Sequence, residues 1–127
     1  MSESTEKRSH IVYVLTKGPE NAEVALLPFV HAVGALVTEI DASVVLLASA
    51  VMLSQKGTAR HVRHGDLAPL DELLKNFMEL GGKLYLCTPC YKGRGYDEND
   101  HLIEGVIPIA AATYNELLLS ADTVVSY

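Results

Sequence analysis

The sequence is poor in basic residues and in cysteine. Lys and Arg number 10 against 16 Asp and Glu, which gives a formal net charge of −6 over 127 residues. No basic stripe is present that could displace the counterions of a phosphate backbone, so nucleic-acid binding is not expected as the main role. There are only two cysteines. In a reducing compartment they favour catalysis, sulfur handling, redox sensing or metal binding over a structural disulfide.

Nucleotide motifs and long hydrophobic runs are also absent. The loop after the first predicted strand lacks Gly-x-Gly-x-x-Gly, and no Walker sequence occurs, so we expect no nucleotide cofactor and assign no other cofactor. The longest apolar runs, 24–37 and 44–53, are shorter than the roughly 20 residues of a membrane helix and predict core elements. Residues 1–10 are polar and carry no apolar signal region. We therefore expect a mobile leader over 1–10, a single domain over 11–127, and a cytoplasmic protein without membrane contact.

Apolar runs alternate with helical patterns along this domain. Runs rich in β-branched and aliphatic residues predict strands that are covered on both faces, and their alternation with helices predicts a parallel sheet between two helix layers. The predicted strands are 11–15, 43–50, 84–86, 106–109 and 122–127, and the predicted helices are 20–36, 66–80 and 111–120. The expected fold class is α/β: a three-layer α/β/α fold with a mainly parallel five-stranded sheet and flavodoxin-like topology.

Three segments leave alternatives open. Pro28 falls inside the first helix, so either the helix kinks there or the residues before it form a separate turn. Pro108 makes the fourth strand short or places it at an edge of the sheet. Residues 51–55 are too apolar for a solvated loop, so they form a short helix or a turn that faces an interface.

The stretch 83–96 combines a short strand, both cysteines and a loop rich in glycine. The apolar strand ends as Cys87 arrives, and the proline and glycines that follow force a turn. A thiol reacts as the thiolate, and its pKa falls from roughly 8.5 when cations or backbone N–H groups surround it. Lys92 and Arg94 lie close enough in sequence to act in this way, so an electropositive pocket is predicted around Cys87. The alternative is that Cys87 and Cys90 only pack as small hydrophobic residues.

The predicted sheet brings other loops to the same place. The carboxyl ends of parallel strands share one edge, and ligands of open α/β sheets bind outside that edge. Loops 16–18, 48–52 and 87–95 all follow predicted strands. The candidate residues are therefore Cys87 and Cys90 for catalysis, and Lys17, Lys92, Arg94 and Gly95 for substrate binding.

A local cationic cluster lies inside this acidic chain. Its members are Lys56, Arg60, His61, Arg63 and His64. The cluster is either a solvated loop or a loop that faces an anion. Zinc binding by His61 and His64 together with the cysteines is a further alternative, but the paired spacing of a two-Cys, two-His site is missing, so no metal is assigned.

A set of motifs also occurs in a fixed order. Cys87 ends the third strand, the loop 87–95 carries the pair Arg94-Gly95, the segment 100–106 reads Asp-His-Leu-Ile-Glu-Gly-Val, and the closing helix precedes Asp122. With this order the chain resembles the DsrE/DsrF-like family from residue 11 onward. The resemblance implies a small α/β/α fold, assembly as a dimer, trimer or hexamer, and kinship with sulfur-relay proteins of the DsrEFH and TusBCD type.

The resemblance also implies residue roles. One cysteine, at the position matched by Cys87, carries sulfur as a persulfide in the relay members, and an Arg-Gly pair matched by Arg94 and Gly95 follows it. Donor and acceptor proteins are then the implied partners. Cys90 departs from this pattern, which leaves open whether it would expel a loaded sulfur by forming a disulfide.

Three functional hypotheses result. In the first, the chain is a sulfur carrier or sulfurtransferase-like protein in which Cys87 accepts sulfane sulfur while Arg94 and Lys92 stabilise the anion. In the second, the two cysteines act as a thiol redox switch. In the third, the chain is a non-enzymatic oligomeric binding module whose cysteines only pack and whose segments 51–53 and 91–96 form subunit contacts.

Overall fold

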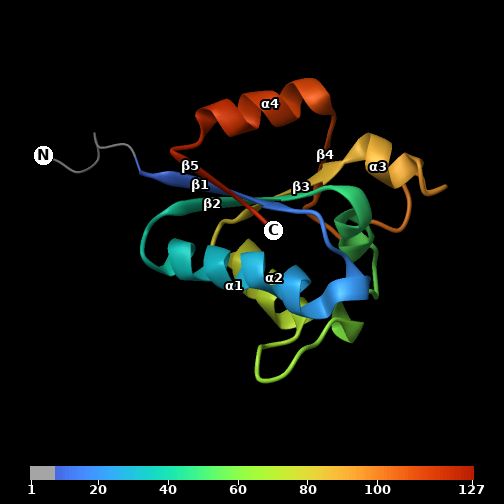
Figure 1. Cartoon of the computed structure of the whole chain (residues 1–127), viewed down its shortest axis with the longest axis horizontal. Coiled ribbons are helices and arrows are strands. Elements are labelled where there is room, and N and C mark those ends of the chain that lie inside the picture. The colour runs from blue at the N-terminus through green and yellow to red at the C-terminus, as the bar shows by residue number, and fades with distance from the viewer. Residues whose placement is uncertain (1–7) are drawn as a thin grey trace, which may run out of the picture.

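The sheet has five strands, all of them parallel (Figure 1). The computed structural model describes residues 8–127, so most of the predicted leader lies outside the described residues. The strands are β1 (His10–Leu15), β2 (Asp41–Leu46), β3 (Lys83–Cys87), β4 (Ile107–Ile109) and β5 (Thr123–Ser126), and their spatial order is β4-β3-β2-β1-β5. The predicted parallel α/β sheet is confirmed. β4 is short and lies at an edge, as Pro108 indicated, and β1 already begins at His10.

The helices follow the strands along the chain. They are α1 (Ala22–Val37), α2 (Leu70–Glu79), α3 (Thr88–Lys92) and α4 (Ala111–Ser120), with 3₁₀ helices η2 (Pro19–Asn21), η3 (Ala48–Ser54) and η4 (Ala59–His61). The chain steps from β1 to β4 in one direction and then returns past β1 to β5. Because parallel connections are right-handed, this reversal moves the crossover helix to the opposite face of the sheet. Figure 1 shows α1 and α2 on one face and α4 on the other, which confirms the three-layer architecture.

The strand order adds one detail to the predicted topology. The flavodoxin order places the second strand at the edge beside the first. Here β5 takes that edge position, and β2 lies on the other side of β1.

The face covered by α1 and α2 holds the larger core. Phe29 of α1 and Phe77 of α2 meet edge to face with ring centroids 5.8 Å apart. Both rings are fully buried, and α2 buries the apolar stripe that its sequence predicted. α1 runs as one helix from its cap at Asn21 through Pro28, so no separate turn precedes the proline.

The opposite face carries a smaller core. Val12, Val14, Val45 and Ile109 are buried there. The half-buried side chains of α4 that pack against them are Tyr114, Leu117 and Leu118. α4 lies over this face (Figure 1), and none of its own residues is fully buried.

The end of β2 differs from its prediction. The strand stops at Leu46, and Ala48 takes a positive φ of 51° that turns the chain into η3. The expectation of a short helix over residues 51–55 is thereby confirmed. Val51 and Leu53 of this helix are buried in the interior, so the alternative that they form subunit contacts is wrong.

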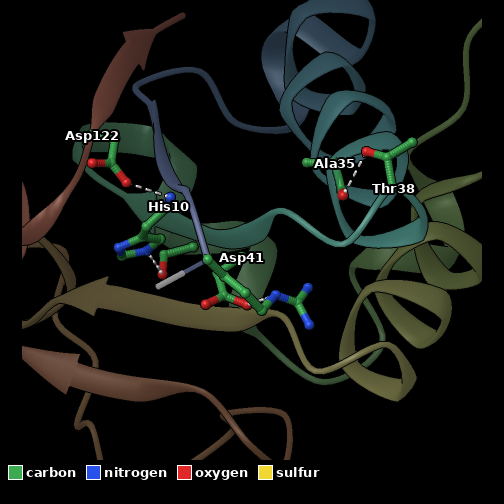
Figure 2. A network of polar contacts seen from close by, with 7 residues as sticks. His10, Ala35, Thr38, Asp41 and Asp122 are labelled. Carbon is green, nitrogen blue, oxygen red and sulfur yellow. Dashed lines mark hydrogen bonds and ion pairs between the residues drawn. The ribbon is translucent and has the colours of Figure 1, made fainter. Parts of the chain in front are cut away.

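Polar contacts fasten the amino ends of the strands (Figure 2). The backbone N–H of His10 donates to Oδ2 of Asp122 at 2.8 Å, and His10 Nε2 lies 2.9 Å from the Oγ of Ser43. Arg8 and Asp41 form an ion pair at 3.1 Å. All of these residues except Asp122 line an open polar hollow of about 770 Å³, at the opposite end of the strands from both cysteines.

The stretch Pro19–Val37 is helical over 19 residues and is apolar enough, by length and composition, to cross a membrane. In this fold α1 buries Ala25, Leu26 and Phe29. They pack in the core between the sheet and α2. Such packing is typical of the core helix of a folded domain, which agrees with the prediction for the run 24–37.

Candidate functional site

Cys87 lies at the carboxyl end of β3, beside the end of β4. The connection from β3 to β4 packs on the α1/α2 face, since Tyr91 of α3 is fully buried in that core. The connection from β4 to β5 packs on the other face as α4. The two connections therefore diverge between neighbouring strands. This divergence is a topological switch point, where open α/β sheets form their ligand crevice.

Both sulfurs are held by backbone amides. The Sγ of Cys87 accepts the N–H of Cys90 at 3.4 Å, so Cys87 caps α3 as well as ending β3. The Sγ of Cys90 accepts the N–H of Ala48 at 3.4 Å. Ala48 is the residue with the positive φ of 51°, which is uncommon for a residue with a side chain, so the turn after β2 points its amide at the second thiol. Both cysteines are free and half-buried.

Burial raises the pKa of the Cys87 thiol, because the thiolate loses hydration. Its hydrogen bond with the Cys90 side chain raises the pKa further. The Cys90 N–H and the charge of Arg94 act in the opposite direction but do not outweigh burial. The prediction of a lowered pKa is therefore wrong for this conformation, and Cys87 is mainly a neutral thiol at pH 7.

A partly enclosed pocket of about 190 Å³ adjoins Cys87. Its walls come from the ends of β2, β3 and β4 and from the start of α4. The lining residues are Leu47, Cys87, Pro89, Ile109, Ala110, Ala111 and Tyr114. None of these seven side chains carries a positive charge, so the pocket beside the thiol is apolar. The prediction of an electropositive pocket around Cys87 is wrong.

None of the three predicted cations lines the pocket, and each has a different place in the structure. Lys92 Nζ lies 3.4 Å from Oε1 of Glu98. Arg94 Nη1 donates to the carbonyl oxygen of Cys90 at 3.0 Å, which keeps the guanidinium beside the thiols. Lys17 follows β1, which β2 separates from β3, so it belongs to a different part of the sheet edge.

The loop after α3 is fixed by glycine and tyrosine. Gly95 has a φ of 86°, a left-handed conformation that suits glycine. Tyr91 and Tyr96 stack with ring centroids 5.4 Å apart. The hydroxyl of Tyr91 accepts a hydrogen bond from Gln55 Nε2 at 3.4 Å, next to η3. Because Tyr91 is fully buried, the expectation that it forms a subunit contact is wrong.

The basic cluster lies around η4, which packs against α2. His64 Nε2 is 3.6 Å from Oε2 of Glu23, and the five basic side chains are exposed, as expected of a solvated loop. Within residues 8–127, no three His, Cys, Asp or Glu side chains are placed to share a metal ion. Zinc binding by His61, His64 and the cysteines therefore finds no support in this geometry.

A second polar cluster at this edge was not predicted from the sequence. The Gly18 N–H donates to Oγ of Ser49 and to Oε2 of Glu20, both at 3.1 Å. The hydrogen bond from Ser49 lowers the pKa of Glu20, with smaller contributions from Gly18 and Lys17. A Cβ on Gly18 would lie 2.3 Å from the carbonyl oxygen of Ser49, so this contact requires glycine.

The apolar side of the candidate site was also missed. Leu47, Ile109 and Tyr114 were predicted only as strand and helix residues. The rule for switch points would have indicated them, but its use requires the strand order, which no local pattern supplies.

Residues 9–127 match the DsrE/DsrF-like family. The chain belongs to this family. Among relatives of this DsrE/DsrF-like chain, the uncharacterized protein MJ0989 of Methanocaldococcus jannaschii is 32% identical over 117 residues, which are 90% of this chain and 96% of that protein. The uncharacterized protein MK0008 of Methanopyrus kandleri is 34% identical over 97 residues, which are 76% of this chain and 75% of that protein.

Solved structures share the DsrE-like fold. The crystal structure of the ychN protein from E. coli matches with a TM-score of 0.79 and 24% identity, over 94% of this chain and 99% of that chain. The protein of unknown function MTH1491 from Methanobacterium thermoautotrophicum matches with a TM-score of 0.68 and 14% identity, also over 94% and 99%. At these identities the likeness establishes the fold. DsrE/DsrF-like proteins are often components of sulfur relays.

Proposed function

We propose that this chain is a cysteine-based sulfur carrier or sulfurtransferase-like protein of intracellular sulfur metabolism, in which Cys87 accepts sulfane sulfur as a persulfide. The observation that carries the proposal is a half-buried thiol, held by the Cys90 N–H, at the switch point between β3 and β4. Membership of a family that often serves sulfur relays supports the class. The role requires a sulfur donor and an acceptor protein, and a reducing cytoplasm suits both free thiols.

Loading Cys87 is an exchange between sulfur atoms. The thiolate of Cys87 attacks the outer sulfur of a donor persulfide, the donor S–S bond breaks, and the donor leaves as a thiolate. The raised pKa keeps the ionised fraction of Cys87 small at neutral pH. The attack therefore depends on the groups that stabilise the anion as it forms, which are the Cys90 N–H and the nearby charge of Arg94.

The other predicted binding residues differ in how directly each would act on the anion at Cys87. Arg94 acts on the anion directly, and Gly95 allows the turn that holds Arg94 in place. Lys92 is paired with Glu98, so its role is weaker than that of Arg94. Lys17 would meet only a ligand that extends along the edge toward β1.

Mass measurement after incubation with a persulfide donor tests the proposal. We expect the wild-type chain to gain the mass of one sulfur atom and Cys87→Ser to gain none. Cys90→Ser is the matched control, since it keeps the proposed acceptor and should still be loaded. Equal loading of Cys87→Ser and the wild type would remove the assignment.

A dithiol switch is the second candidate, favoured by the nearness of the two cysteines, since the Sγ of Cys87 accepts the Cys90 N–H at 3.4 Å. In this reaction the thiolate of Cys90 attacks the inner sulfur of a Cys87 persulfide, hydrosulfide leaves, and a disulfide forms. Sulfide release from the loaded wild-type chain, absent in Cys90→Ser, would identify this reaction. Stable persulfide in both proteins would favour the carrier.

We also propose that the chain forms a homo-oligomer. Leu119 of α4 is 87% exposed, and Val124 and Val125 lie exposed on the edge strand β5. Exposed apolar residues on an edge strand favour pairing with another chain. Light scattering should give a dimer or larger assembly, and Val124→Lys should reduce its size. A monomeric wild-type chain at micromolar concentration would exclude the proposal.

A further inference from the structure

We propose that the apolar pocket beside Cys87 binds the uncharged organic substituent of a low-molecular-weight persulfide, R–S–SH, and thereby selects the sulfur donor. This inference rests on the proposed sulfur-carrier function and adds the chemical class of the donor. Three features support it: the size of the pocket, the character of its walls and the position of the reacting sulfur.

The size of the pocket fits a small substituent. Its volume is about 190 Å³. One water molecule occupies about 30 Å³ of liquid, so the pocket has room for about six waters, or for a short aliphatic chain or one aromatic ring. Pockets for drug-sized ligands begin at about 300 Å³, so a peptide segment of a donor protein is too large for it.

The walls favour an uncharged substituent. Leu47 and Ile109 supply aliphatic surface, and Tyr114 supplies an aromatic ring. Arg94 donates to the Cys90 carbonyl oxygen, and neither Arg94 nor Lys92 lines the pocket. A carboxylate or ammonium placed here would lose its hydration without a partner, which is costly. The net charge of −6 disfavours anionic donors further.

The position of Cys87 connects the pocket with the chemistry. Cys87 itself is one of the lining residues, so a substituent bound there carries its own sulfur to the thiol. Holding two reactants side by side makes their reaction effectively unimolecular. The thiolate of Cys87 then bonds to the outer sulfur of R–S–SH, the S–S bond of the donor breaks, and R–S⁻ leaves while the proton stays on the transferred sulfur.

Methanethiosulfonate reagents measure the selectivity of the pocket apart from sulfur carriage. Each transfers a substituent to a thiolate as a mixed disulfide and releases methanesulfinate. In Cys90→Ser, where Cys87 is the one remaining cysteine, we expect the ethyl reagent to react about tenfold or more faster than the sulfonatoethyl and trimethylammonioethyl reagents, after division by their rates with a free model thiol.

Variants of α4 separate the pocket from general access to the thiol. Ala111→Leu, made in the same background, places a larger side chain at the pocket and should remove the preference for the ethyl reagent. Ala112→Leu is the matched control, because Ala112 is the next residue of α4 and does not line the pocket. Tyr114→Ala widens the pocket and should raise the relative rate of a benzyl reagent, which tests the same point without filling the pocket.

Loading with sulfur completes the test. We expect benzyl persulfide to add one sulfur atom to Cys87 faster than glutathione persulfide, which is charged. Equal loading by both, or loading only by a persulfide-bearing cysteine desulfurase, would overturn the donor assignment and leave the sulfur carrier intact. Absence of loading by every donor would overturn the carrier function and the donor assignment together.

Discussion

The two faces of the sheet are built differently. On one face, α1 and α2 enclose a core that centres on the buried rings of Phe29 and Phe77. On the other face, α4 alone covers four buried residues and keeps its own side chains partly exposed. The pocket beside Cys87 belongs to the second face, between the end of β4 and the start of α4. The comparison indicates that stability comes mainly from the first face, which leaves the second face free to vary around the thiol.

The largest expected effect tests this division directly. Phe29→Ala should lower the free energy of unfolding by about 3–5 kcal/mol, because it opens a cavity in the core between the sheet and the helices α1 and α2. Leu118→Ala, on the α4 face, should cost only about 1 kcal/mol, because its side chain is already half-buried in the folded chain. Urea denaturation followed by circular dichroism measures both. Equal losses would show that the two faces contribute alike.

Added volume should give the next largest effect. A Cβ on Gly82 would lie 2.3 Å from the ring of Phe77, so Gly82→Ala should cost about 1–3 kcal/mol through overpacking of the closed face. Gly34→Ala is the matched control. Gly34 lies within α1, and its Cβ would meet nothing within 4 Å, so that substitution should stabilise the chain by about 0.5–1 kcal/mol. Thermal unfolding of both variants distinguishes the outcomes by sign.

The thiol itself offers a third test, this time on the α4 side. Alkylation of Cys87 in Cys90→Ala should rise with pH to a midpoint above that of a free cysteine, since burial is the largest cause of the raised pKa. Arg94→Gln should move the midpoint higher, because the positive charge of Arg94 favours the thiolate. Because the pKa of Cys87 is higher in the folded chain than in the unfolded chain, the neutral thiol stabilises the fold fully at pH values below the unfolded pKa. This stabilisation is lost as the pH rises through the folded pKa. A midpoint below that of a free cysteine would mean that positive charge or donated hydrogen bonds outweigh burial at Cys87.

The smallest effect concerns the polar end of the same sheet edge. Ser49→Ala should raise the pKa of Glu20 toward its ordinary value of 4.5, because the hydrogen bond from Ser49 is the main cause of the lowered pKa. Glu20 stabilises the fold above the pKa of the unfolded state, and this contribution is lost as the pH falls through the folded pKa. Carbon-detected nuclear magnetic resonance titration of the Glu20 carboxyl follows the shift. If the pKa of Glu20 is unchanged in Ser49→Ala, the Gly18 N–H or the charge of Lys17 is the main cause of its lowered pKa instead.

The sequence predicted the α1/α2 face better than the site. Continuous runs such as 11–15 and the spacing of Leu70 to Phe77 are local patterns, and burial on a closed face produces them directly. The pKa of Cys87 could not be predicted in the same way. This pKa depends on how deeply the end of β3 is buried and on where the side chains of Lys92 and Arg94 lie. Lys92 pairs with Glu98, and Arg94 donates a hydrogen bond to the Cys90 carbonyl oxygen.

The residues that line the pocket could not be predicted from the sequence for a related reason. Leu47 and Tyr114 are far apart in sequence, and they meet only because β4 lies beside β3 and α4 starts at the same edge. Apolar residues at such positions look identical to core residues in any local pattern. Local sequence therefore indicated Cys87, the nucleophile of the proposed reaction, whereas the surroundings that would set its reactivity depend on the tertiary arrangement.

The hydrogen bond between His10 and Asp122 joins residues that are 112 positions apart. Contacts of such separation carry a large loop-closure cost and form slowly. β1 is an inner strand that needs β5 as its second neighbour. During synthesis on the ribosome, more than 100 residues must emerge after β1 before β5 exists, so the edge of β1 that β5 covers stays unpaired over that interval. The edge of β1 that pairs with β5 is therefore exposed to other unpaired strands for longer than the edge that pairs with β2.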